Sequence, residues 1–346
     1  MRVRAIALRH VAASLMAIAS VLPTPAQERV DPHSPEVRSK IAALQQAQAS
    51  VVGIRSVAVS DARSSEFLGR VRQGSGVVIG NDGLVVTIGY LVLEADDVEL
   101  VLDNGRVIPA RIVANDIASG LALVQALAPL RLPPAKLGSS TQVSDDDPLM
   151  VASGGDDADL SMARLVARRA FSGYWEYHID GALFTTPPRT DHSGAALFNA
   201  NGELLGIGSL IVMDTLGEEK PSLPGNMFVP VDLLKSALPE LRANGTTRQS
   251  RRPWLGVNCV EVDGIVRIVR VTPQSPASEA GLLAGDIILR VEHIDISTLE
   301  SFYKVLWQGE GADRDVTLEV SRDGVPTTVK AHATDRMRLL RQPKGV

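Results

Sequence analysis

The pattern of hydrophobic and polar positions predicts one early helix followed by many short strands. Ser34-Pro35-Glu36 is typical of a helix start, with serine as the N-cap and proline in the first turn, and the helical period continues to about Ala49. From Val51 onward the apolar period is short and strand-like, and sequences such as Asn81-Asp82-Gly83 mark tight turns. This spacing favours antiparallel barrels or sandwiches over βαβ units. The predicted strands are 51–59, 76–79, 84–88, 98–102, 107–113, 121–127 and 204–212.

A change of composition near residue 243 predicts a second domain. A helix over 230–241 ends the strand-rich region, and the polar stretch 243–253, which contains glycine and proline, is typical of an interdomain linker. We find no internal repeat. The predicted organisation is a leader over 1–26, a helical segment over 27–50, a first domain over 51–242, the linker over 243–253, a second domain over 254–336 and a tail over 337–346.

The first 26 residues have the order of a secretory signal. Arg2, Arg4 and Arg9 precede an apolar run over 11–22, and Pro-Thr-Pro-Ala follows it, so we expect cleavage after Ala26. The run is shorter than the roughly 20 residues that span a bilayer, although an uncleaved anchor is the alternative. The segment predicts a periplasmic or secreted protein.

Composition excludes several classes of protein. The 346 residues are 45% hydrophobic and 22% charged, which is a globular composition with room for two domains. A net charge of −5 argues against nucleic-acid binding, which needs a basic face. One cysteine excludes an intrachain disulfide framework and a thiolate metal cluster. No His/Cys/carboxylate cluster has ligand spacing, so we expect no metal and no cofactor.

Several motifs resemble the HtrA/Deg family of trypsin-like serine proteases, the DegP/DegQ-like proteins, over about residues 50–336. The matching segments lie in three parts of a protease domain and in a PDZ domain. They are Gly74-Ser75-Gly76 with Asn81-Asp82-Gly83, Ser193-Gly194-Ala195-Ala196-Leu197 with 201–207, 225–230, Trp254-Leu255-Gly256-Val257, Ser275-Pro276-Ala277, Ala280-Gly281-Leu282 and Ala284-Gly285-Asp286. The resemblance implies a mainly β fold: a chymotrypsin-like double β-barrel followed by one PDZ domain of α+β type.

The same resemblance places the catalytic positions, and three of them have changed. Ser193 stands at the nucleophile, but Tyr90 occupies the position of the catalytic His and Gly120 that of the orienting Asp. Tyrosine has an ordinary pKa near 10, so it is a poor general base at neutral pH. Asp191 replaces the oxyanion-hole glycine, where a β-carbon strains the backbone and a carboxylate opposes a developing negative charge. The expectation is a degenerate site with a vestigial serine.

The positions of the histidines support that expectation without an alignment. The six are His10, His33, His178, His192, His293 and His332. None lies between residues 34 and 177, so the first barrel lacks an imidazole. His192 adjoins Ser193, and either faces solvent on its loop or serves as a rewired base, while His178 belongs to a strand of the second barrel or takes that role. Asp116 is a turn residue or a displaced acid.

Peptide binding is the capability that the sequence retains. In a PDZ domain a peptide adds a strand in a groove, and backbone N–H groups of a loop bind its terminal carboxylate. Leu255, Gly256 and Val257 match that loop, and apolar C-terminal residues are the expected ligands. Four residues of a helix over 298–308 either line this groove or face the domain core: Leu299, Phe302, Tyr303 and Leu306.

An aromatic cluster and the single cysteine complete the candidates. Five of the 13 aromatic residues fall within 171–184 and form either barrel core or a peptide-contacting loop: Phe171, Tyr174, Trp175, Tyr177 and Phe184. Cys259 is predicted to be a buried apolar residue in a strand.

Three functions compete. The first is a periplasmic pseudoprotease that binds unfolded polypeptides or C-terminal peptides in envelope protein quality control, or regulates active HtrA relatives. The second is an active serine endopeptidase with an atypical site, and the third is a structural scaffold. The family forms trimers through aromatic residues near its N-terminus, whereas residues 27–66 contain none, so the sequence does not support that trimer and leaves other oligomers open.

Overall fold

The computed structural model describes residues 34–145, 147–217, 220–309 and 311–341. The predicted signal segment 1–26, the start of the 27–50 segment and the last residues of the 337–346 tail lie outside the described residues. No helix in the described part is long and apolar enough to cross a membrane.

The predicted first helix is confirmed, and its start is where serine and proline place it. Helix α2 spans Pro35–Ala49, and the Ser34 side chain accepts a hydrogen bond from the Val37 N–H at 3.2 Å. This cap satisfies one of the N–H groups that a helix start leaves without a partner. Leu44 and Ala47 are buried where the helix meets the first barrel.

The first domain contains two barrels, as the family resemblance implied; the strand pattern alone had left barrels and sandwiches open. The first is closed, in the order β1-β2-β3-β6-β5-β4. Its strands are β1 Val51–Ala58, β2 Val71–Val78, β3 Leu84–Ile88, β4 Ala95–Val101, β5 Val107–Asp116 and β6 Leu121–Ala126, with the short helices α3 Ser65–Leu68 and η2 Gly89–Leu91.

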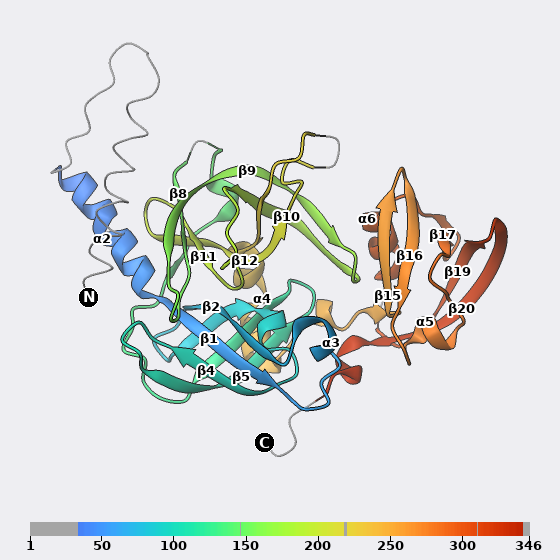
Figure 1. Ribbon diagram of the computed structural model, residues 1–346, viewed down its shortest axis with the longest axis horizontal. Coiled ribbons are helices and arrows are strands. Elements are labelled where there is room, and N and C mark those ends of the chain that lie inside the picture. Colours follow the sequence, from blue (N-terminus) through green and yellow to red (C-terminus); the bar gives the residue numbers. More distant parts are fainter. Residues whose placement is uncertain (1–33, 146, 218–219, 310, 342–346) are drawn as a thin grey trace, which may run out of the picture.

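The second barrel is formed by a sheet with the strand order β11-β8-β9-β10-β13-β12-β7. The sheet closes into a barrel because β11 also pairs with β12. Its elements are β7 Lys136–Leu137, η3 Ser140–Gln142, β8 Leu149–Ala152, β9 Leu160–Gly173, β10 Tyr177–Thr186, β11 Ala196–Phe198, β12 Glu203–Val212, β13 Gly225–Pro230 and the closing helix α4 Val231–Asn244. Figure 1 shows the two barrels stacked, with β9 and β10 extending from the upper one toward the C-terminal domain.

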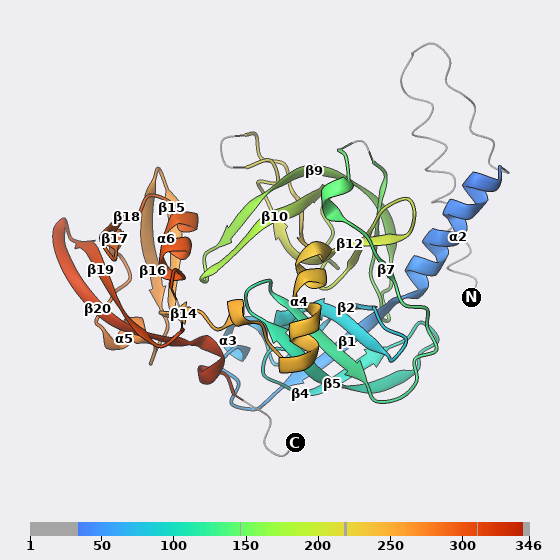
Figure 2. The same ribbon diagram turned by 180° about the vertical axis from the view of Figure 1, so that it is seen from behind.

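The C-terminal domain has its own sheet and its own hydrophobic core. The sheet order is β14-β20-β19-β17-β16-β15, so β15 is an edge strand. The short helix η4 Arg248–Ser250 precedes the domain. The elements of the domain are β14 Pro253–Trp254, β15 Val257–Val262, β16 Ile265–Val271, α5 Pro276–Glu279, β17 Ile287–Val291, β18 Ile294–Asp295, α6 Leu299–Leu306, β19 Arg314–Arg322, β20 Val325–Asp335 and η5 Arg336–Leu339. Figure 2 shows α6 on the side of this domain that faces the second barrel.

Two predicted boundaries differ from the structure. Helix α4 continues to Asn244, so the predicted linker 243–253 begins inside a helix. The segment is also anchored, because the buried hydroxyls of Thr247 and Ser250 both donate hydrogen bonds to the Asp116 carboxylate. The predicted helix 298–308 is shorter, since Thr298 is the N-cap of α6 and the helix ends at Leu306.

Candidate functional site

Ser193 and Tyr90 meet between the two barrels. Tyr90 lies in η2, directly after β3, and its hydroxyl oxygen lies 2.8 Å from Ser193 Oγ and 2.7 Å from the carbonyl oxygen of Ser209 in β12. The serine loop is held against β2, because Ser75 N–H donates to the Ser193 carbonyl at 2.8 Å. The tyrosine therefore stands where the family resemblance placed it, within hydrogen-bond distance of the serine.

Hydrogen-bond chemistry decides what this pair can do. A carbonyl oxygen only accepts hydrogen bonds, so the Tyr90 O–H group donates its one hydrogen bond to the Ser209 carbonyl. The Ser193 hydroxyl then donates a hydrogen bond to Tyr90 Oη. Burial raises the pKa of Tyr90 to about 12, against the opposing effect of the bond with Ser193. The phenol is neutral at pH 7, and a neutral phenol oxygen does not take a proton from serine.

Glycine is required next to the serine. Gly194 has a φ of +74°, and a Cβ built there would lie 1.9 Å from the carbonyl oxygen of Ser75. The Ser193-Gly194 pair is therefore explained by the close approach of the loop to β2.

The position of the orienting acid is filled by another side chain. Gly120 has a φ of +78°, and a Cβ there would lie 3.1 Å from Tyr177 Oη and 3.2 Å from Tyr177 Cε2. The Tyr177 hydroxyl donates to the Ser119 carbonyl at 2.7 Å, which keeps the ring in place. A residue with a Cβ at position 120 is strained by the positive φ and requires the buried Tyr177 to shift slightly.

Asp116, the nearby acid, has a structural role. Its carboxylate is buried and accepts hydrogen bonds from four groups: Ser119 N–H at 3.2 Å, Ser119 Oγ at 2.5 Å, Thr247 Oγ1 at 2.6 Å and Ser250 Oγ. These donors come from the β5–β6 turn and from the segment before the C-terminal domain. The carboxylate thus joins the two segments and does not orient a base.

Asp191 is held away from a catalytic role by an arginine. Arg189 donates from Nε to Asp191 Oδ1 at 2.9 Å and from Nη2 to Oδ2, and Ser153 Oγ donates to Oδ2 at 2.5 Å. Burial opposes ionisation, but these bonds hold the pKa of Asp191 below its ordinary value. The backbone strain expected at this position is absent, because Asp191 is not among the described non-glycine residues with positive φ. The Asp191 carboxylate is thus paired with Arg189 and Ser153.

Neither histidine of the second barrel reaches the serine in the contacts described. His192 is half-buried, Nδ1 lies 3.1 Å from the Arg189 carbonyl, and burial lowers its pKa. His178 is in β10, as predicted, with Ser172 Oγ 2.9 Å from Nδ1 and Asp180 3.3 Å from Nε2.

His178 and Asp180 also form, with Glu300, the one group of described residues whose ligand atoms could hold a metal. The Lys304 ammonium lies 2.5 Å from Glu300 and 3.6 Å from Asp180. This lysine already supplies the positive charge, so the group is an ion-pair cluster.

The candidate peptide groove is assembled in the C-terminal domain. The Leu255-Gly256-Val257 loop leads into edge strand β15. Position 256 requires glycine, because its φ is +88° and a Cβ there would lie 2.4 Å from Ser275 Cβ. The four helix candidates are all buried in the domain core: Leu299, Phe302, Tyr303 and Leu306. Cys259 is free and buried in β15, as predicted.

The groove is not empty. The three loop N–H groups of Leu255, Gly256 and Val257 all donate to the carboxylate of Glu176, which lies at the tip of the β9–β10 hairpin. The aromatic cluster divides accordingly: Tyr177 and Phe184 are buried in the barrel, whereas Tyr174 at the tip contacts the C-terminal domain. Sequence reasoning missed Glu176, since an acid in a hairpin turn is ordinary, and only its place beside the aromatic cluster hinted at a role.

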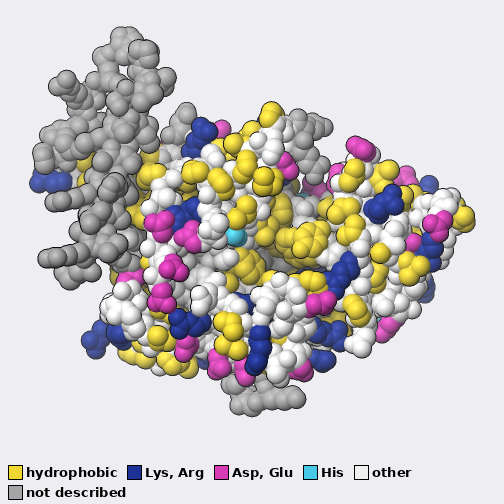
Figure 3. All heavy atoms as spheres, viewed as in Figure 1, with side chains coloured by type: hydrophobic (Ala, Val, Ile, Leu, Met, Phe, Trp, Pro, Cys, Tyr) yellow, Lys and Arg dark blue, Asp and Glu magenta, His cyan; other side chains and the backbone are white. Residues whose placement is uncertain are grey.

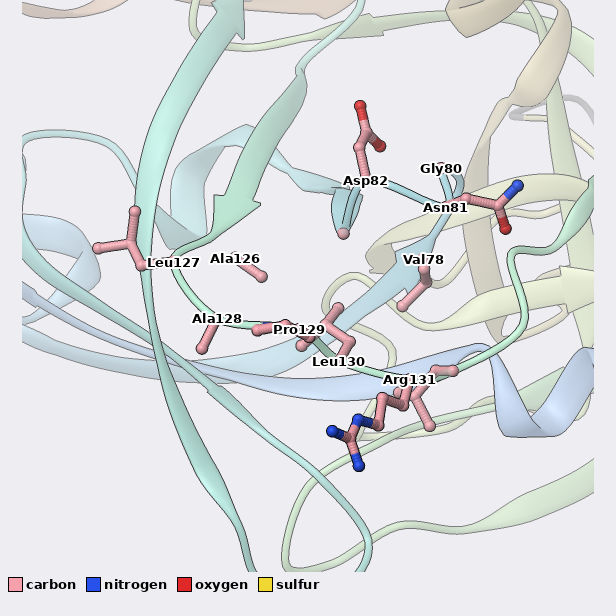
Figure 4. Close-up of a pocket in the computed structure, with 12 residues that line it drawn as sticks. Val78, Gly80, Asn81, Asp82, Ala126, Leu127, Ala128, Pro129, Leu130 and Arg131 are labelled. Atoms are coloured by element: carbon pink, nitrogen blue, oxygen red, sulfur yellow. The ribbon is translucent and has the colours of Figure 1, made fainter.

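A separate surface pocket of about 530 Å³ lies on the first barrel. Figure 4 shows it between the Asn81-Asp82-Gly83 turn and the segment 126–132 that follows β6. The Asp82 carboxylate is engaged by Arg242 at 3.0 Å, and none of the groups around Ser193 lines the pocket.

Two family descriptions match this chain. A trypsin-like peptidase domain matches residues 74–207, and a PDZ domain matches residues 253–332. The fold and the site thus define a trypsin-like peptidase domain followed by a PDZ domain, in agreement with the expected fold class. Among the proteins that the chain is similar to are DegP-like and DegS serine endoproteases and HtrA-type proteases of known structure.

Curated relatives include two bacterial proteins. A probable periplasmic serine endoprotease DegP-like of Marinomonas sp. (strain MWYL1) is 29% identical over 269 residues, which cover 74% of this chain and 55% of the relative. The serine endoprotease DegS of Haemophilus influenzae is 28% identical over 234 residues, covering 64% of this chain and 65% of DegS. The chain thus spans between about half and two thirds of the length of these relatives.

Solved structures of the same fold include the HtrA-type protease AlgW with a decapeptide. It has a TM-score of 0.53 and 20% identity, and the match covers 88% of this chain and 99% of that one. The serine endoprotease from Yersinia pestis has a TM-score of 0.52 and 22% identity, covering 86% and 97%. These likenesses support the fold.

Proposed function

We propose that this protein is a periplasmic pseudoprotease whose PDZ domain binds unfolded or C-terminal segments of polypeptides in envelope protein quality control. The observation that carries the proposal is the contact among Tyr90, Ser193 and Ser209. Acyl transfer requires a base that removes the serine proton. Here the serine hydroxyl is hydrogen-bonded to a neutral phenol, which itself donates a hydrogen bond to a carbonyl and is a poor base.

The loss of turnover that follows removal of a catalytic residue supports an inactive protein over a slow protease. In a well-measured serine protease, removing the nucleophile or the histidine costs about 10⁶ in turnover. Three positions support this: Tyr90 stands beside Ser193 at the position expected for the base, Gly120 lies against Tyr177 at the position expected for the acid, and Asp191 replaces the expected oxyanion-hole glycine. Three changes in one catalytic unit leave Ser193 as an ordinary hydroxyl.

Peptide binding is supported by the loop of three converging N–H groups and by the edge strand beside it. The related AlgW structures hold a tripeptide or a decapeptide. We infer that the ligands here are polypeptides with apolar C-terminal residues, and that an active HtrA relative is a second kind of partner. The periplasmic location rests on the signal-like start of the sequence and on relatives named periplasmic.

A casein digestion assay on the full chain and on Ser193→Ala tests the proposal. We expect the same background for both proteins, with an active HtrA protease digesting the same casein in parallel. Casein turnover by the native chain that Ser193→Ala abolishes identifies the active endopeptidase instead.

A further inference from the structure

The carboxylate of Glu176 occupies the place where a PDZ loop binds a peptide's terminal carboxylate. Gly256 and Val257 N–H donate to Oε1 at 2.7 and 2.9 Å, and Leu255 N–H donates to Oε2 at 3.1 Å. Three N–H bonds from one short loop to one carboxyl group are typical of carboxylate capture, and they oppose the rise in pKa that burial causes at Glu176. Glu176 is buried, and its carboxyl group takes up all three loop donors.

The backbone beside Glu176 has the register of an added strand. Cys259 N–H, on the free edge of β15, donates to the Tyr174 carbonyl at 2.8 Å. Tyr174 thus lies opposite Cys259, while Glu176 lies at the loop before β15, so the two segments run antiparallel. A peptide that ends at the loop has this arrangement, with its last residue at Glu176 and the residue two before it at Tyr174.

Unlike the last residue of a bound peptide, Glu176 is followed by more chain, and its backbone angle shows how that chain leaves the groove. Glu176 has a φ of +56°, a conformation that non-glycine residues rarely adopt. This turn sends the backbone away into β10 while the side chain enters the loop. The angle is the one that the third residue of a three-residue hairpin loop adopts, since Gly173 pairs with Tyr177.

The groove helix closes over the hairpin tip. The Tyr303 hydroxyl in α6 donates to the Gly173 carbonyl at 2.7 Å and accepts from Glu176 N–H at 3.2 Å. Trp307 stacks on Tyr303, and the Arg252 guanidinium lies 3.4 Å above the Trp307 ring. Figure 1 shows the β9–β10 hairpin reaching α6 and β15, and Figure 3 shows hydrophobic side chains on this face where the second barrel approaches the C-terminal domain.

We infer that the hairpin tip Gly173–Glu176 is an internal ligand of the PDZ groove, with Glu176 in place of a terminal carboxylate, and that an external polypeptide binds only by displacing it. The inference rests on the proposed peptide-binding function. The displacing partner is a polypeptide with a free C-terminal carboxylate, because the loop N–H groups recognise that group. Its measured affinity is reduced by the fraction of molecules in which the tip has left the groove.

Glu176→Gln in the full chain tests the inference. Glutamine removes the charge and places an amide NH₂ near the loop donors, so it weakens the internal ligand. Glu279→Gln is the matched control, since Glu279 is an exposed acid of the same domain. The probe is a pool of fluorescent random decapeptides with free carboxyl ends, and the same pool with amidated ends reports binding that ignores the carboxylate.

We expect Glu176→Gln to bind the carboxylate pool at least about tenfold more tightly than the native chain and Glu279→Gln, with no such gain for the amidated pool. Equal affinity of the native chain and Glu176→Gln overturns the displacement while leaving peptide binding in place.

Hydrogen exchange of the Leu255, Gly256 and Val257 N–H groups separates the remaining outcomes. We expect slow exchange in the native chain and in Glu279→Gln, and faster exchange in Glu176→Gln. Unchanged protection in Glu176→Gln shows that the carboxylate does not hold the tip and overturns the inference. Faster exchange without peptide binding by any protein overturns the proposed function, and displacement by peptides with it.

Discussion

The serine site between the barrels and the groove of the PDZ domain are both occupied by the chain's own side chains, but with different consequences. At the serine site, in the function proposed above, the residues at the positions of base and acid have changed: Tyr90 lies beside Ser193, and Gly120 lies against Tyr177. In the PDZ groove the binding groups are all present, and a removable side chain, Glu176, satisfies them.

The difference teaches how a function can be lost or withheld. In the function and the inference proposed above, restoring catalysis requires new residues at positions 90, 120 and 191, whereas restoring peptide binding requires only that one hairpin tip leave a groove. The first barrier is built into packing, and the second is an equilibrium that a ligand can shift.

The largest effect on the free energy of unfolding is expected for Asp116, the buried acid near the serine site whose role is structural. Asp116→Ala removes the acceptor for four buried donors, so the free energy of unfolding should fall by about 3 to 5 kcal/mol. Chemical denaturation measures this, with Asp97→Ala, an exposed acid of β4, expected to change stability by less than about 0.5 kcal/mol. Similar losses in both variants contradict the structural role.

A substitution that adds one methyl group to the loop of residues 255–257 tests whether this loop binds the peptide carboxylate. Gly256→Ala places a Cβ 2.4 Å from Ser275 Cβ and disturbs the N–H groups on both sides, so affinity for the carboxylate peptide pool should fall by at least about tenfold. Gly264→Ala is the matched control, because Gly264 also has a positive φ but no atom within 4 Å of its Cβ position. Binding that survives Gly256→Ala places the peptide site elsewhere.

Introducing an aspartate at position 120 tests whether packing against Tyr177 prevents an acid from occupying that position. Gly120→Asp meets a positive φ and the Tyr177 ring, so it should lower stability by about 1 to 3 kcal/mol more than Gly105→Asp. Gly105 has the same φ of +78° with open space around its Cβ position, so the difference isolates the clash with Tyr177. Equal losses in thermal or chemical unfolding show that the place of the acid is still available.

The last effect appears only at high pH and concerns the Tyr90 phenol. Its pKa of about 12 in the folded chain lies above the ordinary value near 10, so the folded state keeps the proton longer. The resulting stability is present below pH 10 and is lost as pH rises through 12, by about 3 kcal/mol in all. Tyr90→Phe should lose this part of the pH dependence in denaturation curves from pH 9 to 12. A slope unchanged by the substitution contradicts the burial of the phenol.

Much of the fold was predictable because it depends on local patterns. Ser34-Pro35 marked the start of α2, the turn sequences separated the strands, and the motif Leu255-Gly256-Val257 marked the loop of the second domain. The candidate serine site was predictable as a set of positions, since Tyr90 does lie beside Ser193.

The rest depended on contacts between residues far apart in sequence. Nothing in the sequence near Gly120 indicates that Tyr177 fills the neighbouring space, and nothing near Asp191 shows that its backbone avoids positive φ. Glu176 became a candidate only when the hairpin of one domain met the groove of another, because its three donors lie 79 to 81 residues away in the chain.

Labelling of Ser193 with a fluorophosphonate tests the central claim most directly, because the reagent reports activation of the serine without a substrate sequence. Intact-protein and peptide mass spectrometry of the full chain measure the phosphonylated fraction, with an active trypsin-like protease as the positive control. The account predicts that Ser193 stays unmodified under conditions that label the control completely. Stoichiometric labelling at Ser193 contradicts it.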